Sequence, residues 1–270
     1  MKKLLKISLG LILGLGLVGC GSANEDSSTI KVGVVGENNE VWEEVAKRYE
    51  DGTGKKIELV RFSDYNQPNE ALLAKDIDLN AYQHYKFLKE FNDSKGSEDL
   101  IALGNTMLGP MGIYSKKIDR LDDLEDGARV AIPDDPSNGS RALFLLQAAG
   151  LIKVNGEPGD LISLDDLVDN PKNLDLVEMD ASGTPRSLDD TDISIVNDNY
   201  ALDSGLSIEE DALFMEDKDS QAVKEYINII AARSEDKDRE DLKEVVSYYQ
   251  TDETKADYEK YTKGFWIPAW

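Results

Sequence analysis

The residues around Arg141 have the types and spacing of an anion-binding site. Arg141 follows Asp135-Pro136-Ser137-Asn138-Gly139, and apolar residues recur at helical spacing from Ser140 to Ala149, so we expect Arg141 in the first turn of a helix. Free backbone N–H groups and the positive end of the helix dipole favour an anion there. A guanidinium can also bind a carboxylate through two parallel hydrogen bonds. This pattern predicts a carboxylate clamp, and a surface salt bridge is the ordinary alternative for a single arginine.

Other reactive residue types exclude several kinds of site. His84 is the only histidine, so a multi-histidine metal site is impossible, and we expect neither a metal nor a cofactor. The sequence has no Gly-x-Ser-x-Gly elbow and no His-Glu-x-x-His motif, and Gly33-Val34-Val35-Gly36 lacks the third glycine of a dinucleotide fingerprint. An extracellular hydrolase stays the competing hypothesis, because a general acid/base pair among the 54 acidic residues would have no motif of its own.

Strands and helices alternate in the part of the chain that precedes this site. Alternating or continuous apolar runs predict strands, and apolar residues three and four apart predict helices. The expected strands are 30–35, 57–62, 77–82 and 100–105, and the expected helices are 41–49, 69–75 and 84–92. Such alternation predicts an α/β fold with a mainly parallel sheet covered on both faces.

A second set of elements predicts a second α/β lobe. It comprises strands at 129–133, 174–179 and 193–196 and a helix at 140–149 that Gly150 ends. Strands at 212–216 and 226–233 follow, and amphipathic helices at 241–250 and 253–262 are expected to return the chain to the first lobe. We therefore assign residues 30–110 and 213–270 to lobe 1 and residues 111–212 to lobe 2.

The N-terminal residues have the pattern of an export signal. Three lysines within residues 1–6 precede an uncharged apolar run from Ile7 to Val18, which is shorter than the ~20 residues of a membrane-spanning helix. Leu17-Val18-Gly19-Cys20 resembles the bacterial lipobox, whose cysteine is lipidated after cleavage. We expect residues 1–19 to be a signal peptide, Cys20 to be lipidated, and residues 20–29 to form a tether that holds the protein at the cell membrane, outside the cytoplasm.

The charge excludes one class of partner. The formal net charge is −24, and removal of the signal peptide removes three lysines as well. Such a surface repels nucleic acid and anionic lipid. The acidic residues are spread along the chain, so we infer no substrate from them.

Several stretches together resemble the methionine-binding lipoproteins, the solute-binding components of methionine importers of the ATP-binding cassette type. These stretches run in the family's order from the lipobox to about Thr262, and include Asp64-Tyr65-Asn66-Gln67-Pro68-Asn69-Glu70-Ala71-Leu72, Ile77-Asp78-Leu79-Asn80-Ala81-Tyr82-Gln83-His84, Val130-Ala131-Ile132-Pro133-Asp134-Asp135-Pro136-Ser137-Asn138 and Pro185-Arg186-Ser187-Leu188-Asp189-Asp190. The resemblance implies a two-lobed periplasmic-binding-protein fold of type II, with a cleft that closes on one free amino acid.

The resemblance also implies the ligand and the residues that bind it. The ligand would be L-methionine, with D-methionine, a methionine derivative or another amino acid as alternatives, and the partners would be an ABC permease and its ATPase subunits. The protein would not be an enzyme. The implied ligand-binding residues are Tyr65, Tyr82, His84 and Phe87 around the side chain, and Asn138, Arg141, Asn197 and Asn228 at the polar end.

Two aromatic positions depart from the family pattern. Tyr82 stands where phenylalanine is usual, and Phe87 stands where tyrosine is usual. One hydroxyl has thereby moved across the implied pocket. A displaced hydroxyl could favour a more polar ligand, so these positions bear on the choice among methionine, its derivatives and other amino acids.

Overall fold

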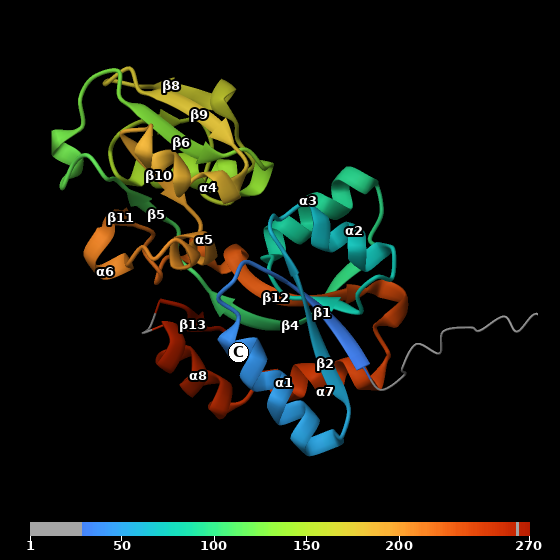
Figure 1. The fold of residues 1–270 in the computed structure, drawn as a ribbon. Coiled ribbons are helices and arrows are strands. Elements are labelled where there is room, and N and C mark those ends of the chain that lie inside the picture. The colour runs from blue at the N-terminus through green and yellow to red at the C-terminus, as the bar shows by residue number, and fades with distance from the viewer. Residues whose placement is uncertain (1–28, 263–264) are drawn as a thin grey trace, which may run out of the picture.

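The computed structural model describes residues 29–262 and 265–270 and has two lobes, each built on its own β-sheet (Figure 1). The predicted signal peptide and all of the predicted tether except Thr29 lie outside these residues. Thr29 is already the first residue of β1. Within the described residues, no helix is long and apolar enough to cross a membrane.

The first sheet has the strand order β13-β4-β12-β3-β1-β2. Its strands are β1 Thr29–Val35, β2 Lys56–Phe62, β3 Leu79–Asn80, β4 Leu100–Leu108, β12 Ile227–Arg233 and β13 Ile267–Pro268. The helices packed on it are α1 Glu40–Thr53, α2 Gln67–Leu73, α3 Tyr85–Lys95, α7 Glu240–Tyr249 and α8 Asp252–Thr262.

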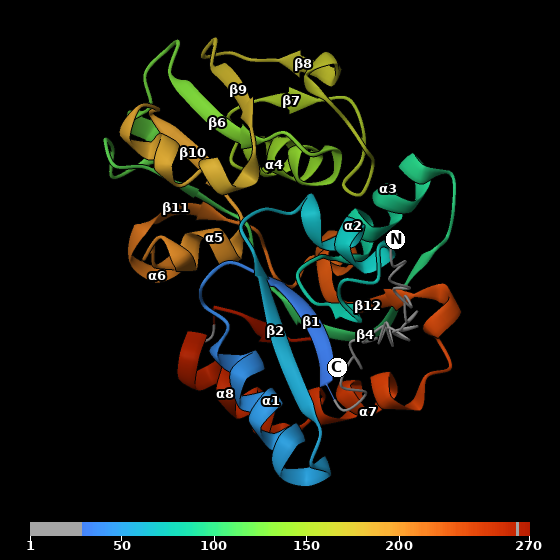
Figure 2. The same ribbon diagram turned by 45° about the vertical axis from the view of Figure 1, so that its right-hand side comes forward.

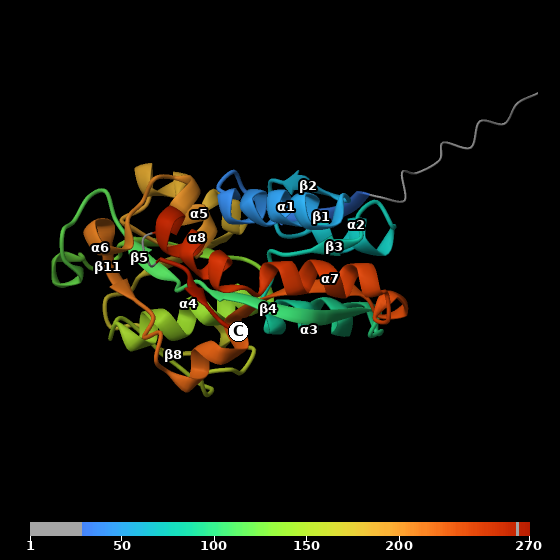
Figure 3. The same ribbon diagram turned by 90° about the horizontal axis from the view of Figure 1, so that it is seen from below.

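Helices cover both faces of this sheet because its strands are apolar on both sides. On one face, Val32 and Val34 pack with Trp42 of α1 and Val245 of α7. On the other face, Leu72 of α2 and Leu88 of α3 pack with alternate strand residues such as Ile229. Seen from below, the C-terminal helices α7 and α8 lie beside α1 (Figure 3). The end of the chain thus completes the core that its beginning starts.

The second sheet has the strand order β11-β5-β10-β6-β9. The elements of this lobe are β5 Gly112–Tyr114, β6 Arg129–Pro133, α4 Pro136–Ala148, β7 Lys153–Val154, β8 Leu167–Asp169, β9 Asp175–Met179, β10 Ile193–Val196, α5 Asp198–Asp203, α6 Ile208–Asp211 and β11 Ala212–Met215. Short 3₁₀ turns in the two lobes are η1 Leu121–Asp123, η2 Leu164–Asp166, η3 Ala181–Gly183, η4 Arg186–Asp189, η5 Gln221–Tyr226 and η6 Ser234–Asp236. Figure 2 shows α4 on the side of this sheet that faces α3 of the other lobe.

Both sheets are mixed, which corrects the expectation of mainly parallel sheets. β1 pairs with β2 and β3 in parallel, whereas β12 pairs antiparallel with β3 and β4, and β13 pairs antiparallel with β4. The second sheet also combines parallel pairs at β6 with antiparallel pairs at β5. The physical reason is the path of the chain, because β4 leads to the second lobe and β12 returns beside it in the opposite direction.

The chain passes between the sheets at two places. β4 ends at Leu108 and β5 begins at Gly112, so residues 109–111 form the first crossing. β11 belongs to the second sheet and β12 to the first, so the second crossing follows Met215. The expected boundary at 212/213 therefore falls inside β11. The exact bounds of the two lobes, 30–110 with 213–270 and 111–212, stay a prediction.

Helix α4 begins earlier than the apolar spacing indicated. It begins at Pro136, which suits the first position of a helix, and the side chain of the N-cap Asp135 accepts a hydrogen bond from Asn138 N at 2.9 Å. Arg141 is therefore in the second turn of α4 and not in the first. The apolar pattern missed this start because the first turn is polar.

A candidate ligand-binding site between the lobes

One cavity between the lobes is lined by all eight residues that the sequence nominated. The space between their atoms is ≈ 260 Å³ and is partly open to solvent. Gln83 and Asp198 line it as well. Lobe 1 supplies Tyr65, Tyr82, His84, Phe87 and Asn228, and lobe 2 supplies Asn138, Arg141 and Asn197.

A buried cluster of amides holds the segment that joins β3 to α3. Asn69 Nδ2 donates to Gln83 Oε1 at 2.9 Å, and Gln83 Nε2 donates to Asn69 Oδ1 at 2.6 Å. Asn80 Nδ2 also donates to Asn69 Oδ1 at 2.9 Å. Buried amides that satisfy one another fix a single backbone arrangement. This cluster therefore positions Tyr82 and His84, which flank Gln83 in the sequence.

Aromatic rings form one end of the cavity. The ring centroids of Tyr65 and Tyr82 are 5.8 Å apart, those of Tyr82 and Phe87 are 5.8 Å apart, and those of Tyr65 and Phe87 are 6.0 Å apart. The two contacts of Phe87 are edge-to-face. Such a wall suits an apolar or thioether side chain, because sulfur at a ring edge gains ~0.3–1.5 kcal/mol.

The hydroxyl groups of this wall are already bonded within the protein. Tyr82 Oη donates to the backbone oxygen of Tyr65 at 2.9 Å. Tyr65 Oη donates to Asn199 Oδ1 across the lobes. The hydroxyl that the sequence places at position 82 therefore has its proton directed at the backbone and not at the cavity.

His84 is held in one tautomer. It is the N-cap of α3, and its Nδ1 accepts from Phe87 N at 3.0 Å, so the ring proton must be on Nε2. Nε2 faces Asn138 Oδ1 at 3.2 Å and donates to it. Burial, followed by the charge of Arg141, lowers the pKa of His84 to about 3. The ring is therefore a neutral hydrogen-bond donor and not an acid-base group.

Asn138 joins the polar groups of the two lobes. Its Oδ1 accepts from His84 of lobe 1 and from Asn197 Nδ2 of lobe 2 at 2.9 Å. Its Nδ2 donates to the carboxylate of Asp135 at 3.0 and 3.1 Å. Burial raises the pKa of Asp135 even though the bonds from Asn138 lower it. The side chain of Asn138 is thus fully used in orienting its neighbours.

Arg141 already has a carboxylate partner in the protein. Its Nε donates to Glu216 Oε1 at 2.7 Å, and its Nη2 donates to Glu216 Oε2 at 2.5 Å and to the backbone oxygen of Gly109 at 2.9 Å. The guanidinium also lies 4.3 Å from the ring centroid of Tyr226. In this state only Nη1 of the guanidinium is available to a ligand. The expected clamp, with two parallel hydrogen bonds from the guanidinium, therefore has a single nitrogen left to donate.

Two further carboxylates of the site were not anticipated from the sequence. Glu216 follows β11 and Asp198 begins α5, and neither lies in a stretch whose spacing indicates a charge partner. Burial raises the pKa of Asp198 to about 6, although the charge of Arg141 lowers it. Within the described residues, no group of three or more histidine, cysteine, aspartate or glutamate side chains is arranged to hold a metal ion.

Contacts at the rim join the lobes on both sides of the cavity. Asp203 of α5 accepts hydrogen bonds from the backbone N–H groups of Glu37 and Asn38, each at 3.0 Å, and from Asn38 Nδ2 at 2.6 Å. On the other side, Lys86 Nζ donates to the backbone oxygens of Gly159 and Asp160. The lobes are therefore closed on each other in this structure.

The two lobes and the cavity between them are the architecture of a substrate-binding protein. The family model described as NlpA lipoprotein matches residues 30–270. The D-methionine-binding lipoprotein MetQ of Escherichia coli K12 is 44% identical over 267 residues, which cover 97% of each chain. The chain belongs to the NlpA lipoprotein family.

Solved structures agree with this membership. A nutrient-binding protein from Burkholderia cenocepacia bound to methionine is 40% identical, with a TM-score of 0.84 over 89% of this chain and 100% of that one. The substrate-binding protein of a methionine transporter from Streptococcus pneumoniae is 34% identical, with a TM-score of 0.85 over 90% of this chain and 96% of that one. These likenesses confirm the expected family and two-lobed fold.

Proposed function

We propose that this protein captures methionine between its lobes and delivers it to an ABC importer. The observation that carries the proposal is that all eight nominated residues line one cavity, which combines an aromatic wall with polar groups. An amino acid presents both an apolar side chain and a charged end, and this cavity complements both. The methionine-binding names of the relatives support the same ligand.

Within this proposal, the aromatic wall of Tyr65, Tyr82, His84 and Phe87 contacts the thioether side chain. Asn197 and Asn228 bond the polar end, Arg141 Nη1 bonds the carboxylate, and Asn138 orients the groups around it. The bond from Tyr82 to the backbone of Tyr65 favours methionine over a more polar derivative, because that hydroxyl is not free to donate to the ligand.

Titration calorimetry of residues 21–270 with L-methionine tests the ligand. We expect saturable binding of L-methionine and weaker binding of methionine sulfoxide, whose added oxygen would meet the aromatic wall. D-methionine, norleucine and glycine complete the series and define stereochemical and side-chain preference. Undetectable heat with L-methionine at millimolar concentration would overturn the ligand assignment.

A second observation would identify the natural ligand without a choice of candidates. Native mass spectrometry of the freshly purified protein should show a bound mass equal to that of methionine, which a denaturing spectrum lacks. A different bound mass would name another amino acid or derivative instead.

The competing function is an extracellular hydrolase. Two arrangements argue against it, since the neutral His84 is locked as a donor and the buried Glu216 is engaged by Arg141. We expect no hydrolysis of a panel of peptide and glycoside substrates. Hydrolysis of any of them would support the competing function.

For localisation, we propose attachment through lipid on Cys20 with residues 20–29 as a tether. The lipoprotein family of the chain supports this assignment. The tether would hold the loaded protein beside its permease and raise its local concentration there.

A further inference from the structure

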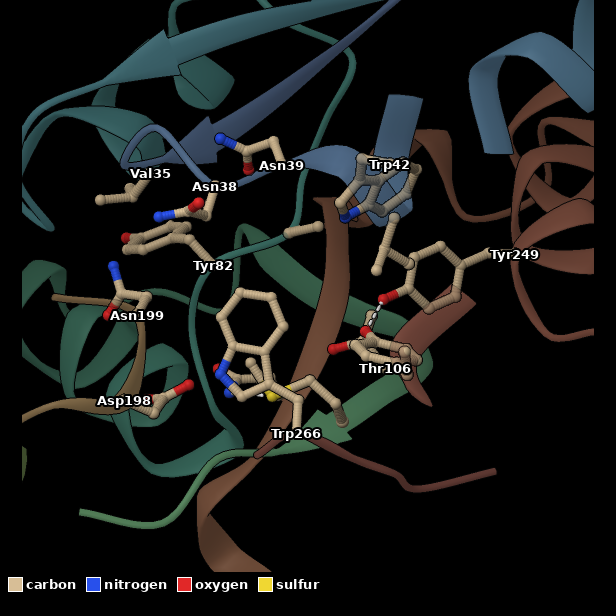
Figure 4. Close-up of a pocket in the computed structure, with 15 residues that line it drawn as sticks. Val35, Asn38, Asn39, Trp42, Tyr82, Thr106, Asp198, Asn199, Tyr249 and Trp266 are labelled. Atoms are coloured by element: carbon tan, nitrogen blue, oxygen red, sulfur yellow. Dashed lines mark hydrogen bonds between the residues drawn. The ribbon is translucent and has the colours of Figure 1, made fainter. Parts of the chain in front are cut away.

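Asp198 has a buried carboxylate, one oxygen of which lacks a hydrogen-bond partner within the described part of the chain. Its residue is only 6% exposed, and Oδ2 has no hydrogen-bond partner among the described residues. The side chain lines the ligand cavity and also an adjoining pocket that is partly open to solvent, where it faces the same space as Trp266 (Figure 4). Burial of an ionised carboxylate is costly unless it is paired, so a function for the charge must be sought.

A second unpartnered acceptor lies beside it. Asn197 Nδ2 is committed to Asn138 Oδ1, which leaves Asn197 Oδ1 buried and without a hydrogen-bond partner among the described residues. Both residues line the ligand cavity. Two adjacent acceptors, one of them charged, match a donor group that carries a positive charge.

Gly109 places Asp198 next to Arg141. Arg141 Nη2 donates to the backbone oxygen of Gly109, and a Cβ atom on Gly109 would collide with Asp198 Oδ2. Both charged groups therefore touch the same glycine. An α-amino acid has its ammonium and carboxylate on one carbon, so it requires an anionic and a cationic partner close to each other.

We propose that Asp198 Oδ2, together with Asn197 Oδ1, binds the α-ammonium group of the ligand while Arg141 Nη1 binds its carboxylate. The assignment rests on the proposed function and sharpens it. The site then takes free α-amino acids and rejects analogues whose nitrogen is absent or acylated, because those leave Asp198 Oδ2 buried without a hydrogen-bond donor.

A purely structural role for Asp198 makes the opposite prediction about stability. If the carboxylate serves mainly as a negative charge in the first turn of α5 or as a partner for the Trp266 indole, Asp198→Asn lowers the melting temperature of the ligand-free protein. If Oδ2 is held without a hydrogen bond for the ligand, the same substitution raises that temperature, because a buried charge with an unsatisfied oxygen is removed.

The test measures two ligands on four proteins by calorimetry and thermal melting. The ligands are L-methionine and 4-(methylthio)butanoate, which is methionine without its ammonium group. The proteins are wild type, Asp198→Asn, Gly109→Ala, which keeps the carboxylate but displaces it, and Asp126→Asn, a matched control at an exposed turn residue of lobe 2.

We expect Asp198→Asn and Gly109→Ala to weaken L-methionine binding at least tenfold. Binding of 4-(methylthio)butanoate to Asp198→Asn should be unchanged or tighter. The control should match wild type for both ligands. A rise in melting temperature of ligand-free Asp198→Asn also supports the proposal. Two results for Asp198→Asn would overturn it: an equal loss of affinity for both ligands, or wild-type affinity for L-methionine. Failure of the wild type to bind L-methionine would instead overturn the proposed function.

Discussion

Arg141 and His84 show how single residues of the site acquire their properties from burial. Arg141 lies 3% exposed against a carboxylate of its own chain, and His84 lies 5% exposed with both ring nitrogens bonded. Neither is free to act as an isolated reactive group. Their electrostatic roles are therefore set by what the protein places around them, and both roles can be measured.

Replacement of Arg141 should separate binding from stability. Arg141→Ala removes the proposed carboxylate donor and leaves Glu216 buried and unpaired, which costs roughly 3–5 kcal/mol of unfolding free energy. The double variant Arg141→Ala/Glu216→Ala should recover most of that stability and still fail to bind L-methionine. Urea unfolding and calorimetry measure the two effects, and wild-type affinity in either variant would exclude Arg141 as the clamp.

His84 should make the ligand-free protein less stable as the pH falls. Its pKa in the folded protein is about 3, below the value near 6.5 of the unfolded chain. The folded state therefore binds the proton more weakly, so stability is full above pH 6.5 and is lost as the pH falls toward 3. Between pH 7 and pH 5 this loss is about 2 kcal/mol.

Urea unfolding of wild type and His84→Gln at both pH values measures this loss. Asp198, whose pKa is raised to about 6, changes stability in the opposite direction over the same range, but it is present in both proteins. The difference between them thus isolates the histidine, and parallel pH profiles would show that His84 is not held neutral.

At the scale of elements, the ends of strands and helices supply the contacts that close the lobes. The turn between β1 and α1 directs two backbone N–H groups at Asp203 of α5, and the first turn of α3 directs Lys86 at two carbonyl oxygens of lobe 2. These contacts lie outside the ligand cavity. They stabilise the closed state without touching the proposed ligand.

Asp203→Ala should therefore speed ligand release more than it slows capture. The substitution removes three acceptor contacts that form only when the lobes are closed. Because the site is partly exposed, we expect roughly a tenfold increase in the dissociation rate, equivalent to about 1.4 kcal/mol. Stopped-flow tryptophan fluorescence measures both rates, with Asp203→Asn as a variant that keeps one acceptor oxygen. An unchanged dissociation rate would show that the rim contact does not stabilise closure.

At the scale of the molecule, two lobes joined by only two described crossings can move as units while the cavity between them opens and closes. The first crossing contains Gly109, which also touches the charged residues of the site. Closure and ligand contact are therefore coupled in space. A protein of this kind works as a carrier, and the proposed attachment to the membrane would determine where it releases its ligand.

Cys20→Ser should release the protein from the membrane without altering its site. Without lipid on residue 20, the protein is expected in the soluble extracellular or periplasmic fraction, whereas wild type sediments with membranes. Calorimetry of the two proteins should give the same affinity for L-methionine. A variant that still sediments with membranes would contradict lipid attachment at Cys20.

The sequence by itself determined the two-lobed α/β class, the family and the eight cavity residues, and it predicts the export signal. These features can be read from the sequence because the spacing of apolar residues, the lipobox and the family motifs are all local patterns. Only the tertiary structure decided that Glu216 occupies two of the Arg141 nitrogens, that the sheets are mixed, and that Asp198 lies against Gly109. These pairs are separated by tens of residues along the chain, and no local pattern records which charges and strands meet when the core closes.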